Sequence, residues 1–342
     1  MTQKPNPIRL RPQTQEPQVH FERAAFAMVM AAVNDQDETD ACRLFPDDNV
    51  IPILLRAAVA PGSTTGWAAE LAQQATAAFL RSLAPQSAAA ALMSYGVEIN
   101  LDRLGRTTVP ARAGLPSILP WVEESQPIPV SKQAITGIPV GPAKKMGLIV
   151  VFSGELAKRS SAQGTFSTLL RESAAVSLDA GYFSTEAGDD KTHVGLLYGV
   201  TPLAGSGNAL DDLTALALAA ASGGSGQVVF VTGPGRAASM AVRMPELKTL
   251  VLPSLAVPDT RVIAVDPASL VHGAGTEPDM TASRSALLHM SDDPLPVVGS
   301  GVTADPVRSL YQTDSIALRC LIDVAFGKRR SGAVAYLDEV TW

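Results

Sequence analysis

The strongest constraint on the fold is a two-residue alternation near the end of the chain. Apolar residues occupy every second position from Ile316 to Phe326, with Arg319 and Asp323 between them. This period is typical of a strand with one buried face, about eleven residues or roughly 36 Å long. The basic turn GKRRSG and the segment AVAYL (333–337) follow. We expect AVAYL to return antiparallel as a hairpin, with the charged residues at the tip of the turn.

A strand with one apolar face needs a covering layer, and a long helix upstream is suited to provide it. The segment from about Thr165 to Thr185 predicts a helix of roughly 31 Å, which we expect to lie across the sheet. Further helices are predicted over 21–33 and 67–83, and a strand over 148–152. The helix stripe expected to face the sheet consists of Phe166, Leu169, Ser173, Val176, Ala180 and Phe183.

Between these scaffold segments, glycine-rich turns separate a series of short elements. The segment 210–221 predicts a helix that opens on Asp211 and Asp212, where acids suit the positive end of the helix dipole. Another helix is expected over 236–244. Strands are expected at QVVFVT (227–232), LKTLVLPS (247–254) and TRVIAVDP (260–267). These elements indicate an α/β lobe inserted into a scaffold that the chain leaves near residue 195 and re-enters near residue 310.

The stretch 105–147 is rich in proline and poor in large apolar side chains. Its prolines are Pro110, Pro116, Pro120, Pro127, Pro129, Pro139 and Pro142. Proline cannot donate to a sheet ladder, so it is confined to edge strands and turns. We therefore expect a long two-stranded excursion with too little side-chain volume for its own core. Because an isolated ribbon is marginal in water, it must lie on another surface.

One glycine motif resembles a cofactor site. Gly233, Gly235 and Ala238 match G-x-G-x-x-A between a predicted strand and a predicted helix, and Asp259 follows where a ribose-binding acid would be expected. However, Pro234 removes a backbone N–H from the turn that would cradle a pyrophosphate. We therefore expect no cofactor here, although the motif leaves a nucleotide-dependent α/β enzyme as an alternative.

Other catalytic and metal signatures are missing from the sequence. The histidines His20, His193, His272 and His289 are scattered, and the cysteines Cys42 and Cys320 form no spaced pair. We predict no catalytic, cofactor-binding or metal-binding residues, and we expect that the protein is not an enzyme. The net charge of −6 gives no indication of nucleic-acid binding through overall charge. Without an 18-residue apolar run or a signal peptide, a soluble protein made in a cytoplasm is expected.

An ordered set of segments resembles one family. The tail YQTDSIALRCLIDVAFGKRRSGAVAYLDEVTW is similar to the end of tailed-bacteriophage major capsid proteins of the Hong Kong 97-type fold. Upstream, four segments follow in the order that such proteins show: GSTTGWAAELAQQATAAFL, LPWVEESQPIPV, GPAKKMGLIVVFSGEL and RVIAVDPASLV. The resemblance covers roughly residues 60–342.

The resemblance implies an α+β capsid fold with four parts. These are an N-terminal arm with helices (1–100), an extended β-hairpin loop (105–147), a peripheral domain (148–200 with 307–342) and an axial domain (201–306). The peripheral domain would carry a long spine helix over an antiparallel sheet, and the axial domain would be α/β. The proline-rich hairpin would then lie across a neighbouring subunit.

The function implied by the resemblance is structural. Copies of the chain would assemble into hexamers and pentamers of an icosahedral phage head that encloses double-stranded DNA. The partners would be other copies, a portal, a scaffold or maturation protease, a decoration protein, and DNA bound without sequence specificity, with no membrane. The chain would be assembled in the bacterial host cytoplasm and located in the virion. An encapsulin-like nanocompartment shell is the first alternative, and the nucleotide-dependent enzyme is the second.

Some members of the family form a covalent lysine–asparagine crosslink between subunits. Lys132, Lys144 and Lys145 are the candidate lysines in and beside the loop. The asparagines are Asn6, Asn34, Asn49, Asn100 and Asn208, so the terminal region that would hold the acceptor has none. We therefore predict that this chain forms no such crosslink.

Overall fold

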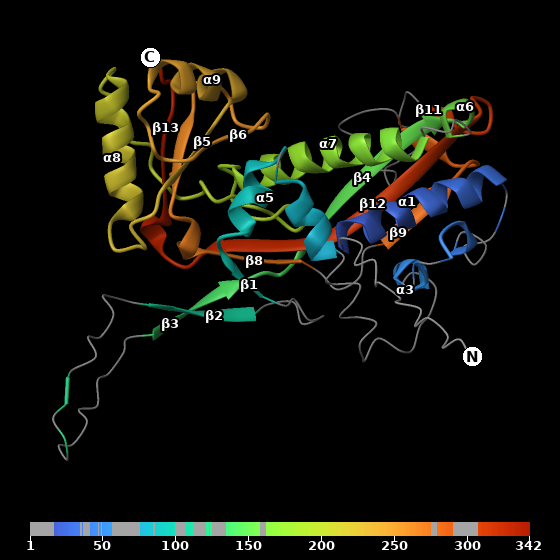
Figure 1. The fold of residues 1–342 in the computed structure, drawn as a ribbon, viewed down its shortest axis with the longest axis horizontal. Helices are drawn as coiled ribbons and strands as arrows, with labels where there is room; N and C mark the ends of the chain where they lie inside the picture. The colour runs from blue at the N-terminus through green and yellow to red at the C-terminus, as the bar shows by residue number, and fades with distance from the viewer. Residues whose placement is uncertain are drawn as a thin grey trace, which may run out of the picture.

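The fold was obtained as a computed structural model of the 342-residue chain (Figure 1). The structure describes residues 17–34, 36, 42–46, 48, 50–56, 76–84, 86–99, 107–112, 121–122, 124, 135–157, 162–274, 279–289 and 307–342. Helices and sheets are both present, arranged as a long scaffold with an α/β lobe at one end (Figure 1). The predicted α+β class is therefore confirmed.

The scaffold is built on β12 (Ser315–Lys328), the long strand expected from the alternation. β12 pairs antiparallel with β4 (Lys144–Ser153) along one edge, and with β9 (Asp279–Ser283) and β8 (Leu270–Ala274) along the other. A short β1 (Val97–Glu98) runs parallel to β8. The alternating apolar residues of β12 are buried, from Ile316 through Phe326, which confirms the predicted face.

The long helix α7 (Ala162–Tyr182) runs along this sheet, as predicted (Figure 1). Its first half contacts β4 through Phe166 and Phe152, whose ring centroids are 5.1 Å apart. Its second half contacts β12 through Tyr182 and Phe326, with centroids 4.5 Å apart. Aromatic pairs at these distances stabilise beyond simple burial.

The predicted stripe on α7 is wrong in register. Leu169 and Val176 are 38% and 39% exposed, and Ala180 is exposed as well. The face that packs inward consists of Phe166, Leu170, Ala174, Ala175, Leu178, Asp179 and Tyr182. Asp179 lies on this face, although an aspartate is unusual on the buried face of a helix. Its burial is explained by hydrogen bonds from distant segments, described below.

The N-terminal helices extend the scaffold core. α1 (Pro17–Asn34) confirms the helix expected over 21–33 and lies beside β9 and β12 (Figure 1). Residues 76–82 are helical, which confirms that part of the helix expected over 67–83, while 67–75 lie outside the described residues. Phe21 of α1 stacks on Phe79 at 4.2 Å. The remaining short helices are α3 (Ile51–Arg56), α5 (Ala88–Met93) and α6 (Gly154–Ala157).

The α/β lobe contains the predicted elements in the predicted order. Its sheet has the order β13-β7-β5-β6, and α8 (Ala209–Ala221) and α9 (Pro234–Arg243) pack on it. The strands are β5 (Val229–Thr232), β6 (Val251–Pro253), β7 (Val262–Val265) and β13 (Val334–Leu337). β5 and β6 are parallel, whereas β7 runs antiparallel to both of its neighbours.

Both faces of this sheet are covered. Phe230, Ala264 and Leu337 belong to the core beneath α8 and α9, whereas Val231 and Ile263 belong to the core shared with the scaffold. This alternation is what a strand period of two requires when both faces are buried. The lobe is thus joined to the scaffold through a continuous apolar core.

The hairpin expected at the end of the chain does not form. β13 pairs with β7 of the α/β lobe and not with β12. Next to the turn, Val324–Lys328 of β12 pair with β8, and Ile322–Val324 pair with β4. The last strand instead extends the sheet of the α/β lobe.

The proline-rich stretch does contain a two-stranded ribbon. β2 (Thr107–Arg112) and β3 (Ile135–Val140) pair antiparallel and leave the scaffold beneath β1 and β8 (Figure 1). The base of the ribbon is buried within its own chain, since Val109 and Val140 form a small core with Val271 and Ala325. The expectation that the ribbon has no intramolecular burial is therefore wrong for its base. Residues 113–120, 123 and 125–134 lie outside the described residues. A separate pair, β10 (Leu287–His289) and β11 (Val307–Ser309), lies elsewhere.

Candidate functional site

The glycine motif lies where a dinucleotide site would be, at the turn from β5 into α9. Gly233 is the N-cap of α9 and Pro234 follows it in the first turn. The space before the helix is filled by Asp259, whose Oδ1 accepts a hydrogen bond from the Arg236 backbone N–H at 3.1 Å. The Nε of Arg236 also donates to the Asp259 carbonyl oxygen at 2.9 Å. A carboxylate of the chain itself thus occupies the position where a phosphate would bind.

The two glycines are explained by this contact. A Cβ atom at Gly233 or at Gly235 would collide with the Asp259 side chain. Glycine is needed here so that the loop carrying Asp259 can approach the helix start. Asp259, considered from the sequence as a ribose-binding acid, therefore takes the place of the anion instead of facing a ribose.

The four histidines lie in different segments: His20 in α1, His272 in β8, His289 in β10, and His193 in the loop after α7. His20 of α1 contacts Asp48, with 2.6 Å between Nδ1 and Oδ2. His193 stacks on Phe326, with ring centroids 4.1 Å apart. His272 of β8 is buried, and this burial lowers its pKa to about 4, so the ring is neutral near pH 7. Among the described residues, no three His, Cys, Asp or Glu side chains gather in a way that could hold a metal ion.

The basic turn after β12 is a structural junction and not an exposed tip. Lys328 donates to the Leu196 carbonyl at 2.8 Å, and Arg329 donates to the Pro110 carbonyl of β2 at 3.2 Å. Arg330 contacts the end of α8. The predicted exposure of these charges is therefore wrong: each of the three cations is half-buried and each holds a different segment.

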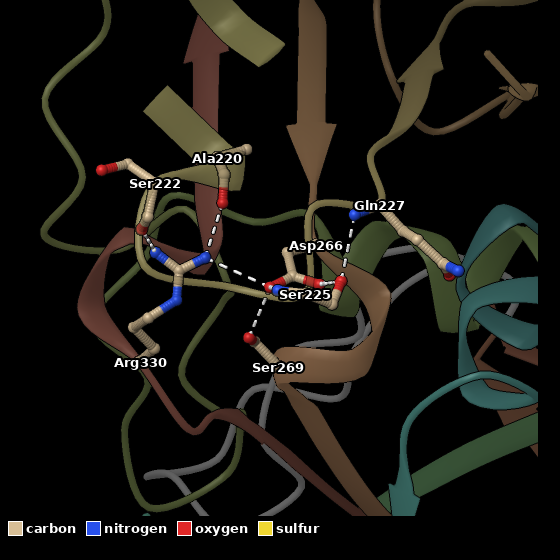
Figure 2. A network of polar contacts seen from close by, with 7 residues as sticks. All are labelled: Ala220, Ser222, Ser225, Gln227, Asp266, Ser269 and Arg330. Atoms are coloured by element: carbon tan, nitrogen blue, oxygen red, sulfur yellow. Dashed lines mark hydrogen bonds and ion pairs between the residues drawn. The ribbon is translucent and has the colours of Figure 1, made fainter. Parts of the chain in front are cut away.

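The innermost part of the junction is the buried carboxylate of Asp266 (Figure 2). It accepts hydrogen bonds from the backbone N–H and the hydroxyl of Ser225 at 3.1 and 2.6 Å, and from the Ser269 hydroxyl at 2.6 Å. Arg330 approaches it at 3.2 Å. Burial alone would raise the pKa of Asp266, but these donors outweigh it and the pKa is lowered, so the group stays ionised.

Arg330 also closes the C-terminal end of α8. Its guanidinium donates to the carbonyl oxygens of Ala220, at 2.5 Å, and Ser222 (Figure 2). The last carbonyls of a helix lack partners within the helix, and a cation there is favourable for the helix dipole. One side chain thus connects the α/β lobe to the end of β12.

A second junction is centred on Asp179 of α7. Its carboxylate accepts from the Ser87 hydroxyl at 2.5 Å and from the first backbone N–H groups of α5, and it accepts from the Ser254 hydroxyl of the α/β lobe at 2.6 Å. Burial raises the pKa of Asp179 despite these hydrogen bonds. Sequence reasoning missed this residue, and its only signal was an acid between Leu178 and Tyr182 on a helix.

The last residue described, Trp342, is held in place. Its indole N–H donates to Asp212 of α8 at 2.8 Å, and the guanidinium of Arg236 lies over its ring, 5.2 Å from the centroid. Asp212 also accepts from the backbone N–H of Ser206 at 2.6 Å. Burial by itself would raise the pKa of Asp212, but the hydrogen bonds from Ser206 and Trp342 have the larger effect, so the pKa is lowered. The aspartate expected to favour the dipole of α8 therefore also binds this tryptophan.

Large apolar side chains are exposed on several separate elements. Leu210 and Leu218 of α8 are 66% and 68% exposed, on the side of the helix away from the sheet. Trp121, which lies between β2 and β3 in the sequence, is fully exposed at 102%. Among the described residues, Val242, Leu255, Leu287 and Tyr311 are also more than two-thirds exposed. Scattered apolar residues are normal on a surface, and these lie on several different elements.

Two of the candidate crosslinking residues, Lys144 and Asn208, make contacts within their own chain. Lys144 donates to the Asp190 carbonyl at 2.8 Å. Asn208 is the N-cap of α8, and its side-chain oxygen accepts from the Leu210 N–H at 3.0 Å. Lys132 and three of the five asparagines lie outside the described residues.

No helix in the described part of the chain is both long enough and apolar enough to cross a membrane.

The chain has an α+β fold. Buried charged residues link segments that are distant in the sequence, and large apolar side chains are exposed on several elements. No family model matches the chain, and no curated protein matches it. Among solved structures it is similar to one titled "Mycobacterium phage Bobi", with 18% identity and a TM-score of 0.46, covering 74% of this chain and 90% of that one. It is also similar to "Mycobacterium phage Cain" (15% identity, TM-score 0.46, 75% and 92% covered). A third is "Capsid of empty GTA particle computed with C5 symmetry" (15% identity, TM-score 0.45, 74% and 91% covered).

Proposed function

We propose that this chain is a major capsid protein that assembles with copies of itself into a closed shell. The observation that carries the proposal is the arrangement of the long helix α7 along the β12 sheet, with an α/β lobe at one end and a separate ribbon leaving the scaffold (Figure 1). It is the arrangement implied by the ordered sequence segments that resemble tailed-phage capsid proteins.

The proposed division of the chain follows the strand pairing. An arm with helices occupies 1–100 and the hairpin loop 105–147, although β4 of the main sheet already begins at Lys144. The peripheral domain comprises 148–200 with 307–342 except β13, together with β8 and β9, which pair with β12. The axial domain comprises 201–306 except β8 and β9, together with β13, which pairs with β7.

We infer that the outer face of α8 contributes to contacts between axial domains. Leu210 and Leu218 are exposed on it, and burying an exposed leucine contributes about 1.5–3 kcal/mol. Repeated around a symmetry axis, such a contact forms a closed ring, which for a capsid is a pentamer or a hexamer. The function then lies in the accumulated contact area, and the proposal includes no catalytic activity.

The remaining partners belong to the same proposal. The shell would enclose double-stranded DNA without sequence-specific contacts, and a net charge of −6 would limit attraction between the wall and its content. A portal, a scaffold or maturation protease, and a decoration protein would act with the chain. Assembly would take place in the host cytoplasm, and the mature location would be the virion.

The test is the size and content of the assembled protein. We expect the full chain, produced in bacteria, to elute as large particles and to show closed shells by negative-stain microscopy. Nuclease-protected DNA inside particles made with the packaging partners would support a virus, whereas a specific protein cargo would support the nanocompartment alternative. A species of one or two subunits at every concentration, with bound nucleotide, would overturn the proposal in favour of the enzyme.

A further inference from the structure

A groove of about 340 Å³ opens between the second half of α7 and the adjoining ends of β4 and β12. Its floor is apolar and includes Leu178, Val324 and Phe326. This volume is near the lower end of the range for pockets that hold small ligands, roughly 300–1,000 Å³. The groove is therefore suited to one large side chain.

The rim of the groove is basic. Lys144, Lys145 and Lys191 line it together with His193, and Glu186 is the one acid among the described residues that line it. The pKa of His193 is lowered, mainly by burial, so this ring adds little positive charge at neutral pH. The three lysines nevertheless outnumber the single glutamate, so the rim favours an acidic occupant.

The loop that carries Lys191 has a fixed shape. Asp189 accepts hydrogen bonds from the backbone N–H groups of Lys191 and Thr192 at 2.7 and 2.6 Å, and from the Thr192 hydroxyl at 2.9 Å. The carboxylate of Asp189 is thus directed into its own loop. A rim that is already ordered loses less entropy when it binds a partner.

A complementary segment is present in the same chain. Trp121 is 102% exposed, so none of the described residues covers its ring, and Val122 and Glu124 near it are also exposed. An indole that becomes fully covered buries roughly 150–250 Å² and is among the strongest contributors to protein interfaces. A tryptophan followed by an acid matches an apolar floor with a rim of lysines.

We propose that Trp121 of one copy inserts into this groove of a second copy, with Glu124 facing the lysines of the rim. The inference rests on the proposed self-assembly and specifies one of its contacts. The occupant is a second copy, because Trp121 does not line the groove of its own chain and because the basic rim complements the acidic segment.

A photocrosslinking experiment tests the position of Trp121. The full chain carrying p-benzoylphenylalanine at position 121 is assembled with unmodified, isotopically heavy chain, irradiated, and analysed by mass spectrometry. We expect light–heavy crosslinks from position 121 to Met146 or to 177–181. The same label at Tyr311, another exposed aromatic residue, is expected to give no crosslinks to the groove. Crosslinks from position 121 to another surface, or only within one copy, would overturn the proposal.

A charge exchange tests the role of the rim. Glu124→Lys and Lys191→Glu are each expected to lower the yield of particles about tenfold, and the double variant to restore most of it. The matched control combines Glu124→Lys with Lys248→Glu, which has the same net charge but changes an exposed lysine that does not line the groove; no recovery is expected. Equal recovery in both double variants would overturn the proposal.

The two proposals fail in distinguishable ways. Circular dichroism and the urea midpoint of unassembled subunits establish that each variant is folded. If the unmodified chain forms no particles at all, the proposed function fails. If it forms particles, but neither the crosslinks nor the charge exchange involve the groove, only the docking of Trp121 is wrong.

Discussion

Replacing Arg330 by methionine is expected to destabilise the subunit more than any other change in the basic turn. The substitution keeps much of the aliphatic side chain but removes the cation that contacts Asp266 and the end of α8. Asp266 is 0% exposed and is held ionised by its hydrogen bonds. After the substitution it remains a buried carboxylate without a counter-ion.

The expected loss in the free energy of unfolding follows from the contacts that Arg330 makes. Removing one member of a buried ion pair costs about 3–5 kcal/mol. This value must be reduced here, because the Arg330 side chain is 21% exposed and water can reach the vacated space. The donors from Ser225 and Ser269 also remain on the carboxylate. Losing the contacts to the Ala220 and Ser222 carbonyls adds about 1 kcal/mol, so we expect a total of about 3 kcal/mol.

The assay is urea unfolding of unassembled subunits, so that assembly does not contribute to the measured stability. The control is Arg329→Met, whose guanidinium makes one hydrogen bond, to the Pro110 carbonyl, and which should cost below about 1 kcal/mol. The contribution of Asp266 is present above its ordinary pKa, about 3.9, and is lost as the pH falls through the lower folded value. The reasoning is refuted if both variants lose equal stability, or if Arg330→Met unfolds within about 0.5 kcal/mol of the unmodified chain.

Three further predictions follow from the buried groups and from the sequence. Because the pKa of His272 falls from about 6.5 to about 4 on folding, the subunit should lose up to about 3 kcal/mol as the pH falls through that window. His272→Gln should remove this part of the acid sensitivity, and an unchanged pH profile of stability would contradict the assignment. Asp179→Ala should cost about 2–3 kcal/mol, because the first N–H groups of α5 and the Ser254 hydroxyl lose their acceptor; the control Glu172→Ala, on the exposed face of α7, should cost below about 0.5 kcal/mol. Purified particles boiled in denaturant should run as a single subunit band on a gel, and a covalent ladder would disprove the predicted absence of a lysine–asparagine crosslink.

The glycine motif shows which features a local sequence pattern can predict and which it cannot. The sequence correctly indicated a strand, a tight turn and a helix around Gly233 and Gly235, since these depend on neighbouring residues. The neighbouring sequence could not predict which group lies at the start of that helix. Asp259 comes from the loop between β6 and β7, and its carboxylate fills the position of an anion. The missing N–H of Pro234 was the only local indication against a phosphate.

The contacts around Asp179 and Arg330 were harder to predict from the sequence than the helices and strands that they join. The predicted stripe on α7 followed a spacing of three and four residues from Phe166, whereas the buried face includes Asp179. The donors that make its burial possible come from Ser87 and Ser254, which lie 92 and 75 residues away. Likewise, Arg330 reads as part of a charged turn until the end of α8 is placed beside it.

The sequence by itself determined the periodic elements: the one-sided strand β12, the long helix α7, and the alternating helices and strands of the inserted lobe. These follow from side-chain periodicity, which acts over a few residues. The tertiary structure decided which sheet receives β13, which face of α7 is buried, and where the charges of the basic turn are directed. The physical reason is that strand edges and buried charges must all be satisfied together, so the partner of each depends on which others are already taken by distant parts of the chain.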